Sequence, residues 1–156
     1  MRRYDDGMST MTRPVESRDL AALQSIDASY ASRLGLPPLI ERAVLAFYAR
    51  SGHAFVRDRD GELLGFVLAH AVWDGGRPTV RLARLAAADD APDVLRGLLE
   101  AVVKSAYDAG VYDVVADAPA DDDAAAAALR GASFEPRPMV RFERVLGSRA
   151  GERVAS

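Results

Sequence analysis

A chain of 156 residues with 49% hydrophobic and 28% charged residues is long enough for one domain with a sizeable core, and this composition excludes wholesale disorder. The formal net charge of −3 disfavours a nucleic-acid-binding protein, because such proteins usually carry a basic surplus. The absence of cysteine excludes disulfides, thiolate catalysis and cysteine-based metal sites, and two histidines are too few for a multi-histidine metal centre.

The ends of the chain show no targeting or membrane-spanning pattern. No apolar run approaches the roughly 18 residues that a spanning helix needs, and no apolar segment follows the basic start of the sequence. We therefore expect a cytoplasmic protein that binds neither nucleic acid nor a membrane. We also expect flexible tails at residues 1–11 and 147–156 around one domain at 12–146.

The first elements predicted are a short extended stretch at 13–15 and two helices. Apolar residues recur at helical spacing from Leu20 to Leu34, behind Ser17 as an N-cap. Gly35 and two prolines end this helix, and the second helix is expected to start at those prolines. Its apolar stripe includes Ile40, Val44 and Tyr48, among others.

The hydrophobic spacing then changes to two, which predicts strands. Two strands are expected at 53–58 and 62–73, joined by a hairpin turn at Asp60-Gly61. Both faces of the second strand are apolar, so we expect both to be covered. A third strand is expected at 79–87, followed by the most clearly periodic helix of the chain at 93–109.

The last part of the chain is predicted to hold a strand at 111–116, an alanine-rich helix through Arg130, and a closing extended segment at 134–145. The strand–helix–strand unit at 79–116 requires a parallel crossover, whereas the hairpin before it is antiparallel. We therefore predict a single α+β domain (of the α/β type) with a mixed, mostly antiparallel sheet and helices on both faces.

Three local patterns resemble those of one known family. They are Arg13-Pro14 with Asp19-Leu20 and Leu23 at the start, Leu98-Leu99 and Ala109-Gly110 in the 93–109 helix, and Ser133-Phe134 after the last helix. With the order of the elements, these patterns resemble the GNAT superfamily of N-acetyltransferases over residues 12–145. The resemblance implies a GNAT fold and acetyl-CoA or another acyl-CoA as co-substrate.

The resemblance also implies where an acyl-CoA would lie. In the family, backbone amides of a loop and helix N-terminus hold the pyrophosphate, because unpaired N–H groups and the positive end of the helix dipole favour an anion. The positions implied for the pantetheine and the pyrophosphate are Arg84, Leu85, Ala86, Ala87, Val94 and Leu95.

This chain departs from the family at the pyrophosphate loop. The R/Q-x-x-G-x-G/A pattern falls on residues 90–95, where Asp90 replaces the basic residue and Asp93 and Leu95 replace the glycines. Pro92 also removes an N–H donor. Two like charges about 4 Å apart repel by about 4 kcal/mol at an effective dielectric of 20, so the aspartates oppose a pyrophosphate.

The family's catalytic landmarks also differ here. The asparagine before the last helix and the tyrosine within it, which acts as a general acid in the family, fall on Asp122 and Leu129. Leucine cannot donate a proton. The three consecutive aspartates at 121–123 are better explained as helix caps than as a cation site, so we expect no metal.

Two other residues are candidates for catalysis. His70, in the long second strand, would face the acceptor cleft as a general base, or it is simply a hydrogen-bonded strand histidine. Glu41, in the second helix, would hold a substrate amine, or it belongs to a solvated helix face. His53 is expected at the surface or as a cap.

Two arginines in the third strand lie on opposite faces by strand parity. Arg84 shares its predicted face with Val80 and Leu82, and Arg81 lies on the other. An arginine in a central strand needs a partner, so Arg84 either helps to bind an anionic ligand or pairs with a carboxylate.

The sequence leaves two functions open. The first is an N-acyltransferase that uses an acyl-CoA and a small-molecule or protein amine, with His70 or a water as the base. The second is a catalytically inactive GNAT-like module that binds a ligand or protein, with a homodimer as one form. An unrelated α/β enzyme is the remaining hypothesis.

Overall fold

The structure is a computed structural model and describes residues 9–147, so most of the expected tails lie outside the described residues. In chain order the helices and strands are β1 (Thr10–Pro14), α1 (Leu20–Leu34), α2 (Arg42–Ala49), β2 (Phe55–Arg59), β3 (Glu62–Asp74), β4 (Arg77–Ala87), α3 (Pro92–Asp108), β5 (Val114–Ala116) and α4 (Asp123–Gly131). Short 3₁₀ turns precede α1 at Ser17–Asp19 and α3 at Ala88–Asp90. Among the described helices, none is long and apolar enough to cross a membrane.

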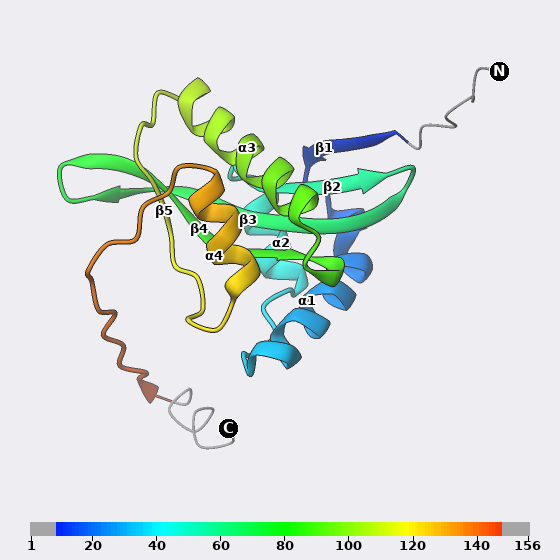
Figure 1. Cartoon of the computed structure of the whole chain (residues 1–156), viewed down its shortest axis with the longest axis horizontal. Helices are drawn as coiled ribbons and strands as arrows, with labels where there is room; N and C mark the ends of the chain where they lie inside the picture. The colour runs from blue at the N-terminus through cyan, green and yellow to red at the C-terminus, as the bar shows by residue number, and fades with distance from the viewer. Residues whose placement is uncertain (1–8, 148–156) are drawn as a thin grey trace.

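The five strands form one mixed sheet in the order β1-β2-β3-β4-β5. Neighbouring strands are antiparallel except for β4 and β5, which are parallel. Helices α1 and α2 cover one face of this sheet, and α3 and α4 cover the other (Figure 1). The predicted α+β fold, with its mixed and mostly antiparallel sheet between helices, is therefore confirmed.

Two hydrophobic clusters hold the layers together. Phe66 and Leu68 of β3 pack with Leu23 of α1 and Leu45 of α2 on one face. On the other face the α3 stripe, including Leu98 and Leu99, packs on β3 and β4. The central part of β3 is thus buried from both sides, as its doubly apolar pattern predicts. The prediction is wrong for residues 71–74, which are exposed because the strand extends beyond the helices there.

A β-bulge in β4 overturns the expected faces of two arginines. Leu68 pairs with Arg84 and the next residue, Ala69, pairs with Leu82, so Ala83 is an extra residue in β4. An extra residue reverses strand parity beyond the bulge. The prediction that Arg81 and Arg84 lie on opposite faces is therefore wrong, because both lie on the face covered by α1 and α2.

The end of the chain also differs from the prediction. Within the described residues, segment 134–146 forms neither helix nor strand and pairs with no strand, so the expected closing strand does not form. The strand expected at 111–116 is limited to Val114–Ala116. At the other end, β1 starts at Thr10, two residues before the expected start of the domain.

Two helix starts are displaced from their expected positions. Ser17 opens a 3₁₀ turn, and α1 begins only at Leu20. Helix α2 begins at Arg42 rather than at the prolines, because its N-cap is Glu41, which has an extended backbone. Glu41 is therefore at the edge of the helix and exposed.

His53 is buried rather than at the surface, since its exposed fraction is 6%. Its Nδ1 lies 2.8 Å from Ser105 Oγ in α3, and Ser105 Oγ donates to the carbonyl oxygen of Val102 at 2.9 Å. This chain of contacts assigns Nδ1 as the donor to Ser105. Burial lowers the pKa of His53, because it disfavours the charged imidazolium.

A pH dependence of stability follows from this burial. Between the lowered pKa of folded His53 and the unfolded value of about 6.5, the unfolded chain binds more protons, so stability falls as the pH drops below about 6.5. The free energy of unfolding, measured in urea, is expected to decrease more between about pH 7.5 and pH 5 for the wild type than for His53→Asn. Parallel losses in both proteins would show that His53 does not contribute.

Candidate functional site

The predicted acyl-CoA position corresponds to the place where β4 and β5 separate. The two strands pair only through residues Val80–Leu82 of β4 and Val114–Ala116 of β5. After the bulge at Ala83, β4 has no pairing with β5, and Arg84 and Leu85 border a narrow cleft, whereas Ala86 and Ala87 do not line it. The cleft is lined by Tyr30, Leu82, Arg84, Leu85, Ala116, Asp117, Ala118, Pro119, Ala125 and Leu129.

This cleft is nearly filled in the structure. Its volume is about 20 Å³, which is room for one water molecule. Leu129 lines it at the position where the family's tyrosine would lie, so no hydroxyl group comes from α4 there. Any ligand larger than a water requires the walls to move apart.

Arg84 is held by a buried carboxylate. Arg84 Nη1 donates to Asp27 Oδ1 at 2.7 Å and to the carbonyl oxygen of Pro37 at 3.2 Å. Asp27 is 1% exposed, and its Oδ2 accepts hydrogen bonds from the amides of Leu39 and Ile40 at 2.6 and 3.1 Å. Arg84 thus ties β4, α1 and the α1–α2 loop together, and its charge is already balanced without a ligand.

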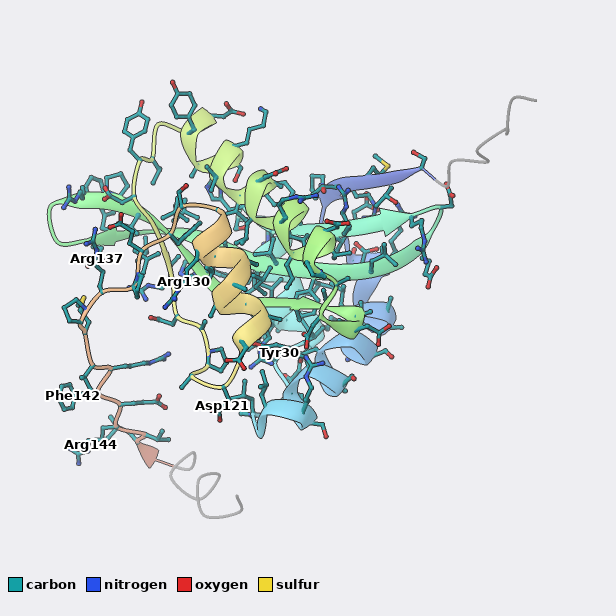
Figure 2. The ribbon with its side chains drawn as sticks, in the orientation of Figure 1. Tyr30, Asp121, Arg130, Arg137, Phe142 and Arg144 are labelled. Atoms are coloured by element: carbon teal, nitrogen blue, oxygen red, sulfur yellow. The ribbon has the colours of Figure 1, made fainter. Side chains whose placement is uncertain are left out.

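A tyrosine spans the cleft from α1 to α4. The Tyr30 hydroxyl donates to Asp122 Oδ2 at 2.8 Å, and Asp122 Oδ1 accepts the Ala125 amide at 3.0 Å as the N-cap of α4. Figure 2 shows Tyr30 beneath the start of α4, near Asp121. Burial and the hydrogen bond to the Asp122 carboxylate raise the pKa of Tyr30, so its hydroxyl stays protonated at neutral pH.

The ring of Tyr30 also lies close to two cations. The guanidinium carbon of Arg84 is 5.5 Å from the ring centroid, and that of Arg33 is 5.9 Å from it. Cations at this range are attracted to the ring face. Arg33 in turn donates to Asp90 Oδ1 at 2.8 Å, so one chain of contacts joins the cleft to the loop between β4 and α3.

The loop between β4 and α3 is acidic, but its charges are partly paired. Asp90 binds Arg33, and Asp93 Oδ1 lies 3.0 Å from Arg96 Nη2 on the same helix. Asp89 and Asp90 both adopt positive φ angles, 54° and 52°. An arginine does reach this loop, but it is partnered by an aspartate rather than left for a phosphate.

The amides predicted to meet a pyrophosphate are engaged in the helix. Val94 N and Leu95 N both donate to the carbonyl oxygen of Ala91, at 3.1 and 3.2 Å, and both side chains are buried. Pro92 is the first residue of α3 and brings no N–H. Leu85, Ala86 and Ala87 are buried at the end of β4 beside them.

The structure does not bring His70 and Glu41 into contact. His70 packs against α2, with its ring centroid 5.6 Å from Phe47 and 5.8 Å from Tyr48. Its Nδ1 is buried and has no hydrogen-bond partner among the described residues. Only Nε2 is therefore left to exchange a proton with solvent or a substrate. Glu41 is exposed, and its side chain makes no cap hydrogen bond to α2.

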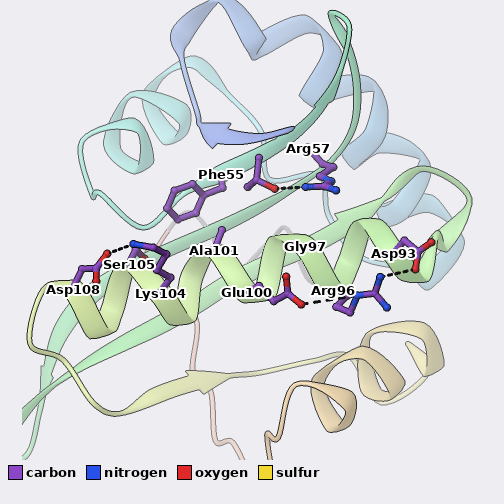
Figure 3. Close-up of a pocket in the computed structure, with 11 residues that line it drawn as sticks. Phe55, Arg57, Asp93, Arg96, Gly97, Glu100, Ala101, Lys104, Ser105 and Asp108 are labelled. Carbon is purple, nitrogen blue, oxygen red and sulfur yellow. Dashed lines mark hydrogen bonds and ion pairs between the residues drawn. The ribbon is translucent and has the colours of Figure 1, made fainter. Parts of the chain in front are cut away.

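A second, wider groove of about 540 Å³ lies between α3 and the β1–β2 edge (Figure 3). Its charged side chains pair with one another along α3, as Asp93 does with Arg96 and Lys104 with Asp108. On the strand wall of the groove, Arg57 of β2 donates to Thr12 of β1 at 2.8 Å. None of the residues predicted for catalysis or acyl-CoA binding lines this groove. Among the described residues, no group of three His, Asp or Glu side chains is placed to hold a metal ion.

Sequence reasoning missed Tyr30, which lines the cleft, and Asp27, which holds Arg84 beside it, although the sequence held a signal for Asp27. Asp27 lies on the buried stripe of α1, four residues after Leu23 and three before Tyr30. A carboxylate in an apolar stripe must have partners. Its partner Arg84 lies 57 residues away, and that distance is what the sequence could not bridge.

The chain is similar to a family and to solved structures. A family described as protein of unknown function (DUF1999) matches residues 40–150. The wild-type TTHA1254 structure from Thermus thermophilus is 39% identical, with a TM-score of 0.75 over 89% of this chain and 99% of that one. No curated protein matches the chain.

More distant structures share the fold. Ribosomal-protein-alanine N-acetyltransferase from Brucella melitensis is 16% identical, with a TM-score of 0.69 over 89% of this chain and 100% of that one. A predicted acetyltransferase with acetyl-CoA from Clostridium acetobutylicum is 9% identical, with a TM-score of 0.69 over 87% and 96% of the two chains. These neighbours establish the GNAT acetyltransferase fold that the resemblance implies.

Proposed function

Because the chain belongs to the DUF1999 family and has the GNAT fold, we propose that it is an N-acyltransferase that takes an acyl-CoA as co-substrate and an amine as acceptor. The observation that carries the proposal is the separation of β4 from β5 after the Ala83 bulge. It leaves the backbone of Arg84 to Ala87 without a strand partner on that side, so an extended pantetheine can hydrogen-bond along it.

The transfer requires the amine to attack the thioester carbonyl carbon, so that a C–N bond forms as the C–S bond breaks. The amine proton goes to a base and the departing CoA thiolate takes up a proton. We assign the base to His70 through Nε2, directly or through a water, and Glu41 to holding the acceptor amine. Arg84 is a positioning residue, because its charge is used by Asp27.

A second function is favoured by the acidic loop and by the Tyr30–Asp122 hydrogen bond across the cleft. Asp89, Asp90 and Asp93 make the loop between β4 and α3 negative, whereas a pyrophosphate favours positive charge there. The cleft has room for one water molecule only. A GNAT-like module that binds another ligand and does not transfer acyl groups fits these two observations.

Binding of acetyl-CoA separates the two functions. At 100 times the Kd, a ligand stabilises the folded state by about 2.7 kcal/mol, which raises Tm by roughly several degrees in a protein of this size. We expect acetyl-CoA and CoA to raise Tm when compared with a nucleotide control at matched salt. Ala118→Trp, which fills the cleft, is expected to abolish the shift, whereas Ala127→Trp on the exposed side of α4 is expected to retain it.

Turnover is then measured as thiol release from acetyl-CoA with a panel of amines. The chain contains no cysteine, so a thiol reagent reports free CoA without background from the protein. We expect release that depends on the amine and falls in His70→Gln. A cooperative melt without any acyl-CoA shift at millimolar ligand would refute the transferase and leave the binding module.

A further inference from the structure

The segment after α4 has the pattern of a strand but no strand partner. Along residues 134–146, even positions are mostly apolar and odd positions mostly charged, which is the period-two pattern of a strand with one buried face. Yet Val140, Phe142 and Leu146 on the apolar face are 76%, 93% and 66% exposed. Figure 2 shows Phe142 and Arg144 on this segment, far from the sheet.

The polar face of the same segment is already satisfied. Arg137 pairs with Glu135, and Arg141 pairs with Glu143, at 3.7 and 3.9 Å. The two prolines lie at 136 and 138, so residues 139–146 each carry a backbone N–H donor, of which that of Met139 already donates to the carbonyl oxygen of Arg137 at 2.8 Å. This stretch is therefore suited to pairing through its backbone with its apolar face covered and its charged face in water.

The sheet of the same molecule has a free edge of matching character. Strand β5 pairs with β4 on one side, and no described strand pairs with its other side. Val80 N donates to the carbonyl oxygen of Asp113, and in a parallel ladder the alternate residues, Val114 and Ala116, direct their backbone groups to the free edge. An unpaired edge of this kind is a template for another strand.

The α4 side of this edge is apolar. Val114 and Ala116 of β5, together with Leu129 and Ala132 of α4, are only partly buried against the α3 core. A strand added beside β5 would place its apolar face against these side chains. The free edge and the free strand therefore complement each other in backbone bonding and in side-chain character.

We propose that two copies of this chain form a homodimer in which residues 139–146 of each copy pair with β5 of the other. The segment runs away from its own β5 in the structure (Figure 1), whereas a two-fold arrangement lets each copy donate one segment and accept one. The exchange covers both the apolar face of residues 139–146 and the free edge of β5, and it needs no other protein. It does not depend on acyl-CoA.

The test is the mass in solution by light scattering after size exclusion. We expect the wild type at twice the 16.7 kDa of the chain and the double variant Val140→Asp, Phe142→Asp at the mass of one chain. Both side chains are exposed in the protomer, so the folded monomer is expected to survive, as a cooperative melt checks. Met139→Asp is the matched control, because Met139 is 84% exposed and lies on the opposite face, and it is expected to stay dimeric.

Hydrogen exchange distinguishes pairing on β5 from another contact of the segment. The amides of residues 112–118 are expected to be protected in the wild type and in Met139→Asp, and to exchange faster in the double variant. A monomeric wild type, a dimer that survives the double variant, or a loss of dimer without any change at β5 would each overturn the proposal. Pairing of the segment with β5 of its own chain would appear as a monomer with a protected edge.

Discussion

Asp27→Asn is expected to destabilise the fold by about 3 to 5 kcal/mol, the cost of removing one partner of a buried ion pair. Each carboxylate oxygen of Asp27 accepts hydrogen bonds, Oδ1 from Arg84 and Oδ2 from the amides of Leu39 and Ile40. In asparagine one of the two oxygens is replaced by an NH₂ group. This hydrogen-bond donor would face another donor, either Arg84 or the backbone amides of Leu39 and Ile40. It would also leave Arg84, whose side chain is 11% exposed, without its counter-charge.

Asp90→Asn is the matched control for this change. Asp90 also meets an arginine, Arg33, at 2.8 Å, but the two side chains are 35% and 44% exposed. Exposed pairs contribute about 0 to 1 kcal/mol, so this variant is expected to unfold at nearly the same urea concentration as the wild type. Similar midpoints for both variants would contradict the view that the Asp27–Arg84 pair organises this side of the sheet.

Gly65→Ala is expected to destabilise the fold by about 3 kcal/mol, near the upper end of the usual cost of overpacking. A Cβ at Gly65 would lie 2.7 Å from the carbonyl oxygen of Ala86 and 2.8 Å from a methyl group of Val94. Two of its three nearest atoms belong to the backbone of β4, which cannot rotate away as a side chain can. The absence of a Cβ is what lets β4 and α3 turn tightly over β3.

Gly97→Ala is the control for Gly65→Ala, because a Cβ at Gly97 would also have a close neighbour. A Cβ there would meet only the Arg57 guanidinium, at 3.2 Å, and this flexible group can shift. Alanine also favours a helix interior by about 1 kcal/mol over glycine, so we expect Gly97→Ala to be neutral or slightly stabilising in urea. Equal losses in the two variants would mean that the close approach at Gly65 is not limiting.

Gly65→Ala also tests the corner where the predicted pyrophosphate loop begins. Displacing Ala86 and Val94 moves the backbone on both sides of the loop. The acyl-CoA shift in Tm is therefore expected to shrink in Gly65→Ala beyond what its lower stability alone explains, and to remain in Gly97→Ala.

Local patterns predicted most of the elements. The apolar stripe of α3, its Pro92 start and its Ala109-Gly110 end indicated a helix of the observed extent. The apolar residues of β3 indicated a strand covered on both faces, which holds for its central part but not for its exposed last four residues. In these elements spacing and burial agree, because one side of a helix and both sides of a central strand meet the core. The parallel crossover through α3 followed from the order strand, helix, strand at residues 79–116.

The candidate site was predicted only in outline. The position of the loop after β4 follows from the resemblance and the strand pattern, but the face of Arg84 does not. One extra residue at Ala83 reverses parity, and a single residue in an apolar strand gives no warning in the sequence. The buried His53 likewise gained a partner, Ser105, from 52 positions away.

The sequence by itself determined the class of fold, the periodic helices and strands, and the acidic character of the loop before α3, since each depends on residues close together in the chain. The tertiary structure decided which groups meet across it: Asp27 with Arg84, and Tyr30 with Asp122, 92 positions apart. It also decided that residues 134–146, although patterned as a strand, have no partner within the described chain. A strand needs a neighbour for its backbone bonds, and no local pattern states where that neighbour lies.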